Sequence, residues 1–184
     1  MRLVEGRADI DDLDAFLADL GEVGEEFDCA VQAFDADLVV GVDHLRTAVE
    51  RADRALDRGE NVARDPAVEI LLYAAGRRQI NRALEMGVDE GEHDVVVVAH
   101  GQAEASDEAG AADAVRGLLA PVETAPASSD AGAVSTDRGP VSADRIDREA
   151  VREFFDVSEA ELDATDASLA DLVRERVALL DVEK

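Results

Sequence analysis

The sequence contains almost no lysine: Lys184 is the only one among 184 residues, and the other 17 basic residues are arginine. Against these 18 basic residues stand 44 Asp and Glu, so the formal net charge is −26. Disorder does not explain this charge, because 47% of the residues are apolar and fall in periodic runs. Carboxylates keep a protein soluble in concentrated salt, so the composition predicts a folded, salt-adapted protein, most economically from a haloarchaeal cytosol.

Cysteine and long apolar runs are also scarce. Cys29 is the only cysteine, so no internal disulfide can form, which fits a reducing compartment. The longest apolar runs, such as 95–99, are far shorter than the roughly 20 residues that cross a bilayer. No signal sequence is recognisable, and we expect a soluble, cytoplasmic protein without a membrane partner.

Familiar catalytic motifs are missing: the sequence has no Walker loop, GxGxxG, HExxH, CxxC or GxSxG. Pairs of carboxylates are uninformative, because 44 acidic residues produce any spacing by chance. His44 is expected to be a structural residue near a helix N-terminus, and His93 a loop residue. His100 follows a predicted strand, where α/β proteins often place ligands. A tetrapyrrole metal chelatase using His100, with His93 as a second histidine, is therefore the enzyme alternative to a structural role for His100.

Hydrophobic periodicity predicts an α+β fold, a single domain over residues 1–184 with a small, mostly antiparallel or mixed sheet packed with several helices. Asp43 is expected to cap the helix that runs to about Arg58 and ends at Gly59. The expected strands are 2–8, 29–34 and 94–99. The expected helices are 11–20, 43–58, 66–75, a second helix directly after Gly76, 111–119, 147–155, 158–164 and a last one that starts at Asp166 or Ser168.

The segment 120–144 holds three of the four prolines and almost no apolar periodicity, so we expect a flexible insert or loop. The last helix carries an apolar stripe. This stripe is expected either to pack on the sheet or, in part, to face a partner.

A short basic and polar segment follows the helix that begins at Pro66. Asp65 can cap this helix, and Gly76 can end it by taking a positive φ. Arg77, Arg78 and Gln79 would then occupy the N-terminus of the next helix, where unpaired amides and two guanidinium groups suit a phosphate. The alternative is that both arginines only solubilise the surface.

Several segments together resemble one family. The run 60–88, ENVARDPAVEILLYAAGRRQINRALEMGV, resembles the signature of the small kinase-binding subunit of the KEOPS complex, the PRPK-binding protein family. Residues 38–48, LVVGVDHLRTA, with Gly59 and Asn61 after them, and 169–181, LADLVRERVALLD, are similar to its earlier and closing segments. The resemblance extends over nearly the whole chain except about 120–144.

The resemblance implies a noncatalytic protein without cofactor or metal. It implies binding and stimulation of the PRPK-type kinase-like ATPase through its N-terminal lobe, and binding of the tRNA acceptor end, CCA, during threonylcarbamoyladenosine synthesis next to the anticodon. The carbamoyltransferase subunit would be an indirect partner. The candidate tRNA-binding residues are Asn61, Arg64, Arg77, Arg78, Gln79 and Arg82. The candidate partner-binding residues are Leu172, Arg176, Val177 and Leu180.

The net charge conflicts with RNA binding at low salt. In molar salt, however, the Debye screening length is roughly 3 Å, and counterion release contributes little to the binding free energy. We therefore expect stacking and hydrogen bonds to dominate tRNA binding, with a weaker salt dependence than usual.

Overall fold

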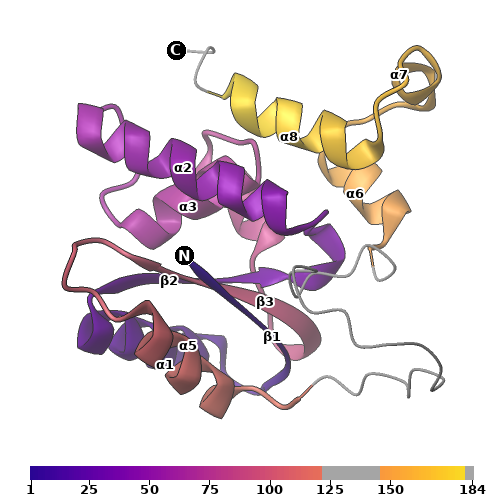
Figure 1. The fold of residues 1–184 in the computed structure, drawn as a ribbon. Helices are drawn as coiled ribbons and strands as arrows, with labels where there is room; N and C mark the ends of the chain where they lie inside the picture. Colours follow the sequence, from indigo (N-terminus) through magenta and orange to yellow (C-terminus); the bar gives the residue numbers. More distant parts are fainter. Residues whose placement is uncertain (122–145, 181–184) are drawn as a thin grey trace, which may run out of the picture.

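The centre of the fold is a three-stranded sheet, seen in a computed structural model that describes residues 1–121 and 146–180 (Figure 1). The strands β1 (Arg2–Ile10), β3 (Gly91–Gly101) and β2 (Cys29–Asp35) lie in that order. Both ladders are antiparallel, and Val97 of β3 lies opposite Val4 on one side and Ala33 on the other. The predicted α+β class with an antiparallel sheet is confirmed.

The central strand β3 is buried on both faces, which explains its uninterrupted run of valines. Val95, Val97 and Ala99 belong to the hydrophobic cluster on one face. Val96 and Val98 belong to the larger cluster on the other. In Figure 1, α1 (Leu13–Phe27) and α5 (Glu108–Leu118) cover the first face, and α2 (Val42–Arg58) and α3 (Pro66–Ala74) cover the second.

The C-terminal part adds three helices on the side of the larger cluster. They are α6 (Arg148–Phe154), α7 (Glu159–Asp163) and α8 (Leu169–Leu179), and α8 packs against α2. Ser168 begins α8 with a capping box, because its hydroxyl accepts from the Asp171 amide and the Asp171 carboxylate accepts from the Ser168 amide. Of the two predicted starts, Asp166 and Ser168, the second is confirmed, and Ser158 caps α7 by accepting from the Glu161 amide.

Several boundaries differ from the sequence prediction. Helix α1 continues past Leu20 to Phe27, because Gly21 and Gly24 interrupt the apolar pattern without breaking the helix. Gly41, not Asp43, is the N-cap of α2. Strand β3 begins at Gly91, which places His93 in a strand and corrects its assignment to a loop.

The helix expected after Gly76 is much shorter than predicted. Only α4 (Ile80–Ala83) is α-helical, and the 3-10 turn η2 (Leu84–Met86) follows it directly; a second 3-10 turn, η1 (Ala36–Leu38), follows β2. Ile80 and Leu84 are exposed, whereas Ala83 and Met86 are buried, so the apolar residues of this segment lie partly at the surface.

Most of the predicted insert 120–144 lies outside the described residues. Its first residue, Ala120, pairs with β1, because it forms two backbone hydrogen bonds of 2.8 Å with Arg7 of that strand.

Candidate functional site

The loop before α3 is held by a buried carboxylate. Glu69 is 1% exposed, and its Oε2 accepts hydrogen bonds from the amides of Val62 (3.0 Å) and Ala63 (2.7 Å). The Asn61 side chain donates to the Ala63 carbonyl at 2.6 Å. Asp65 caps α3 by accepting from the Ala67 amide, as predicted. The loop that carries Asn61 and Arg64 is therefore fixed from within, and the Arg64 side chain is left exposed.

The turn after α3 depends on Gly76. Its φ of +60° lies in the left-handed region that favours glycine. The amides of Gly76 and Arg77 donate to the carbonyls of Tyr73 and Leu72, which closes the end of the helix. The turn directs Arg77 and Arg78 toward the C-terminal helices, and the two arginines precede α4 instead of starting it.

Arg77 connects this turn to the end of α6. Its Nη2 donates to the carbonyl of Phe154 at 2.6 Å and to Oδ2 of Asp156 at 2.8 Å. Its guanidinium also lies over the Phe154 ring, 5.9 Å from the centroid. Arg77 is only partly exposed, with 27% of its side chain accessible.

Arg176 of α8 contacts the same region from the other side. It donates from Nη2 to both carboxylate oxygens of Glu161, at 2.9 and 3.0 Å, and approaches the carbonyls of Phe155 and Asp156 at 3.4 Å. Arg176 also lies close to Gly76, since a Cβ added to Gly76 would be 3.6 Å from the Cβ of Arg176. Arg77 and Arg176 thus jointly satisfy carbonyls at the C-terminus of α6, where positive charge is favourable.

The other predicted tRNA-binding residues lie around this junction. Arg78 donates to the carbonyl of Leu180 at 3.3 Å, and Gln79 is exposed. Arg82 is exposed beside Glu85 at 3.8 Å. Arg78 and Arg82 do not share a helix as expected, because α4 begins only at Ile80.

Exposed aliphatic side chains accompany the arginines. Val62 lines one small recess together with Arg77, Arg78 and Leu180. Val62, Ile80 and Leu84 are 45%, 41% and 54% exposed. The sequence did not predict that Ile80 and Leu84 are exposed, because apolar residues four positions apart are also typical of a core-facing helix. We call the surface formed by Asn61, Val62, Arg64, Arg77, Arg78, Gln79, Ile80, Arg82 and Leu84 the basic corner.

The apolar stripe of α8 faces the protein interior. Leu172 is 5%, Val177 0% and Leu180 6% exposed, and all three belong to the larger hydrophobic cluster. Of the four predicted partner-binding residues, only Arg176 is partly exposed at its side chain, by 34%. Leu179, on the outer side of the same helix, is 43% exposed.

The histidines occupy separate structural positions. His44 is 1% exposed, and it accepts from the Val40 amide at Nδ1 (3.4 Å) and donates from Nε2 to the Ala74 carbonyl (2.8 Å). Burial lowers its pKa to about 4. The expected structural role of His44 fits these contacts.

His100 and His93 do not form a common site. His100 Nε2 lies 2.8 Å from a carboxylate oxygen of Asp53 on α2. The two histidines are seven positions apart along β3, which places them about 23 Å apart on opposite faces. No group of three possible metal ligands occurs within 1–121 and 146–180. The pairing that the chelatase alternative required is therefore wrong.

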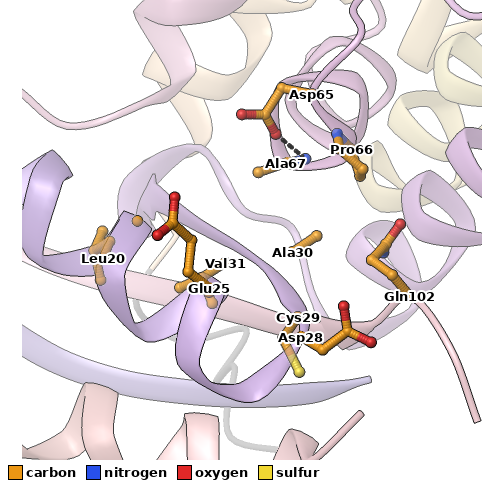
Figure 2. Close-up of a pocket in the computed structure, with 12 residues that line it drawn as sticks. Leu20, Glu25, Asp28, Cys29, Ala30, Val31, Asp65, Pro66, Ala67 and Gln102 are labelled. Carbon is orange, nitrogen blue, oxygen red and sulfur yellow. Dashed lines mark hydrogen bonds between the residues drawn. The ribbon is translucent and has the colours of Figure 1, made fainter. Parts of the chain in front are cut away.

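A cavity of about 300 Å³ lies between α1, β2 and the start of α3, and Asp65, the residue after Arg64 of the basic corner, is part of its lining (Figure 2). Its wall includes Glu25, Asp28 and Asp65, which disfavour an anionic ligand. Cys29 also lines it, but burial and the nearby charges of Glu108, Asp28 and Asp107 raise the pKa of its thiol, which weakens it as a nucleophile.

The basic corner therefore has the features of a binding surface next to α8, with arginines and exposed aliphatic side chains. The sequence model of the family described as kinase binding protein CGI-121 matches residues 9–181. The chain belongs to this family, whose members are noncatalytic kinase-binding subunits of the KEOPS complex. Comparison with curated proteins found none that matches the chain. Among the helices of residues 1–121 and 146–180, none has the length and apolar composition of a membrane span.

Proposed function

We propose that this KEOPS subunit recruits tRNA by holding the single-stranded CCA acceptor end at the basic corner, while α8 binds and stimulates the PRPK-type kinase-like ATPase. The reaction served is threonylcarbamoyladenosine formation next to the anticodon. The carbamoyltransferase subunit carries out the transfer and is reached indirectly through the kinase-like subunit. Family membership supports kinase binding, and the composition of the corner supports RNA.

One observation carries the RNA part of the proposal: Arg77, Arg78 and the exposed Val62 line one recess. A single-stranded end needs cations for its phosphates and apolar surfaces against which unpaired bases stack. Ile80 and Leu84 supply further apolar surface beside Arg82. Asn61 and Gln79 add amide groups that can bond to base edges.

The kinase part of the proposal uses both sides of α8. Leu172, Val177 and Leu180 contribute by fixing the helix on α2 and the core. Arg176, with the neighbouring Leu179, presents the surface that the kinase lobe contacts. Leu180 also accepts from Arg78, so the kinase-facing helix and the basic corner meet at one point. Such proximity would let one partner position the other.

We further infer that binding takes place in the cytoplasm of a salt-adapted archaeon. The composition supports this, with a net charge of −26 and arginine replacing lysine almost completely. Contact geometry then outweighs long-range attraction, because the Debye length is roughly 3 Å at 1 M salt.

The test is co-purification with the PRPK-type subunit of the same genome in molar potassium chloride, followed by titration with intact and CCA-trimmed tRNA. The proposal predicts kinase capture and a loss of RNA affinity on trimming. It also predicts that Arg77→Glu with Arg78→Glu weakens RNA binding more than Arg46→Glu with Arg116→Glu, two exposed arginines on other elements. Equal affinity for intact and trimmed tRNA would contradict the RNA part alone.

A further inference from the structure

Arg77 already holds an anionic group. Its Nη2 lies 2.8 Å from Oδ2 of Asp156, and the same nitrogen donates to the Phe154 carbonyl. A guanidinium binds a carboxylate and a phosphate through the same N–H donors. If Arg77 contacts RNA, as the proposed function requires, the phosphate must therefore share or take the place of the Asp156 carboxylate.

Asp156 lies at the surface beside Arg77, with Arg82 and Arg176 nearby. Its pKa is held below the ordinary value by the hydrogen bond from Arg77, and the charges of Arg77, Arg82 and Arg176 act in the same direction. Its backbone φ of +54° is the left-handed conformation, which aspartate and asparagine adopt more readily than most residues. The chain turn after α6 thus places a carboxylate within hydrogen-bond distance of the Arg77 guanidinium.

The contact can open without disturbing the core. The Asp156 side chain is 69% exposed, so its carboxylate can turn into water, whereas Arg77 remains attached through the Phe154 carbonyl and ring. The core residue beside it, Phe155, is 2% exposed and packs edge-on against His44, which anchors the end of α6 independently of the ion pair.

We propose that Asp156 is an internal competitor of RNA: its carboxylate occupies the phosphate position at Arg77 in the free protein, and an RNA phosphate displaces it on binding. This inference rests on the proposed function and adds a regulation to the same site. The ion pair keeps the guanidinium in place and lowers the affinity for weakly bound anions. In a protein that works in concentrated salt, such a competitor would favour a polyanion that makes several contacts over single ions.

The test compares Asp156→Asn with Glu159→Gln in tRNA titrations in molar potassium chloride. Asparagine keeps the shape and tolerates the left-handed backbone but removes the charge. Glu159 is a matched control, since it is 81% exposed, pairs with Arg152 at 3.3 Å in the same C-terminal part and gives the same change in net charge. Thermal unfolding of both variants checks that they fold.

We expect Asp156→Asn to bind tRNA roughly three- to fivefold more tightly than the original chain, which is the upper part of the range that an exposed ion pair contributes. Glu159→Gln should stay within about twofold. The gain should disappear when Arg77→Gln is added to Asp156→Asn. Equal affinities for the two single variants would overturn the inference, and weaker binding by Asp156→Asn would overturn it by showing that Asp156 orients Arg77 for RNA.

Arg77→Gln alone separates the inference from the proposed function. If Arg77→Gln weakens tRNA binding but Asp156→Asn does not strengthen it, only the competition is wrong. If Arg77→Gln leaves tRNA binding unchanged, the RNA contact of Arg77 and the competition are both wrong.

Discussion

At the scale of single residues, the few basic side chains serve the fold as well as the surface. Arg77 and Arg176 were predicted as contacts to RNA and kinase, and the structure shows both bonded to the C-terminus of α6. Sequence could identify them as unusual, because positive charge is rare in this chain. It could not show the internal partners of Arg77, since Phe154 and Asp156 are more than 70 residues away from it along the chain.

Glu69 offers a test of how the basic corner is built. Glu69→Ala leaves the amides of Val62 and Ala63 without their acceptor, so we expect the free energy of unfolding to fall by about 2–4 kcal/mol. The loop with Asn61 and Arg64 should loosen, and tRNA affinity should fall with it. Denaturant titration measures the first effect. Glu175→Ala, at an exposed position of α8, should change stability by about 0.5 kcal/mol or less; an equal loss in both variants would contradict this role of Glu69.

His44 predicts a pH dependence of stability. Burial lowers its pKa from 6.5 to about 4, so the unfolded chain takes up a proton below pH 6.5 while the folded protein does not. The stabilisation that the neutral His44 contributes is fully present above pH 6.5, and it is lost as the pH falls toward 4. Between pH 6.5 and 5 the loss should be about 2 kcal/mol. Urea titrations of the original chain and His44→Gln should show a smaller loss in the variant, and equal losses would argue against a neutral buried His44.

At the scale of elements, local signals predicted most helices and strands but not their full lengths. The Asp65 cap, Pro66 and Gly76 correctly bounded α3, because caps and turns depend on neighbouring residues. The helix after Gly76 was overestimated, since the apolar spacing of Ile80 and Leu84 is the same on a core-facing helix and on an exposed turn. Whether such residues face the core or the solvent depends on tertiary packing, which a local sequence pattern does not predict.

The turn at Gly76 can be tested against an equivalent glycine. Gly76 and Gly59 both have left-handed backbones, with φ of +60° and +67°, and each follows a helix of the same layer. Alanine at either position should lower the free energy of unfolding by about 1 kcal/mol. Only Gly76→Ala should also weaken tRNA binding, because Gly76 sets the direction of Arg77 and Arg78. Similar RNA affinities in both variants would show that the turn does not position the arginines.

At the scale of the whole molecule, the excess of acidic residues predicts how stability depends on salt. The 44 acidic residues repel one another at low salt, and added salt screens this repulsion. We expect the midpoint of thermal unfolding to rise from 0.1 M to about 2 M potassium chloride and then level off. Circular dichroism at a series of salt concentrations measures this rise. A constant or falling midpoint over that range would contradict salt adaptation.

The candidate site was predictable as a region but not as an assembled surface. The basic residues within 60–88 stood out in an acidic chain, and the family pattern covers them. The contribution of α8 could not be predicted in detail, because an amphipathic stripe does not reveal whether it meets the core or a partner. The structure places Leu172 and Val177 in the core and joins the end of α8 to Arg78.

The most direct test of tRNA recruitment at the basic corner is photo-crosslinking from a modified 3′-terminal nucleotide of tRNA, mapped on the protein by mass spectrometry. The experiment uses the complex with the PRPK-type subunit in molar potassium chloride. We predict crosslinks to residues 61–64 and 77–84. Crosslinks confined to other surfaces, such as α1 or the cavity lined by Glu25 and Asp28, would contradict recruitment at this corner.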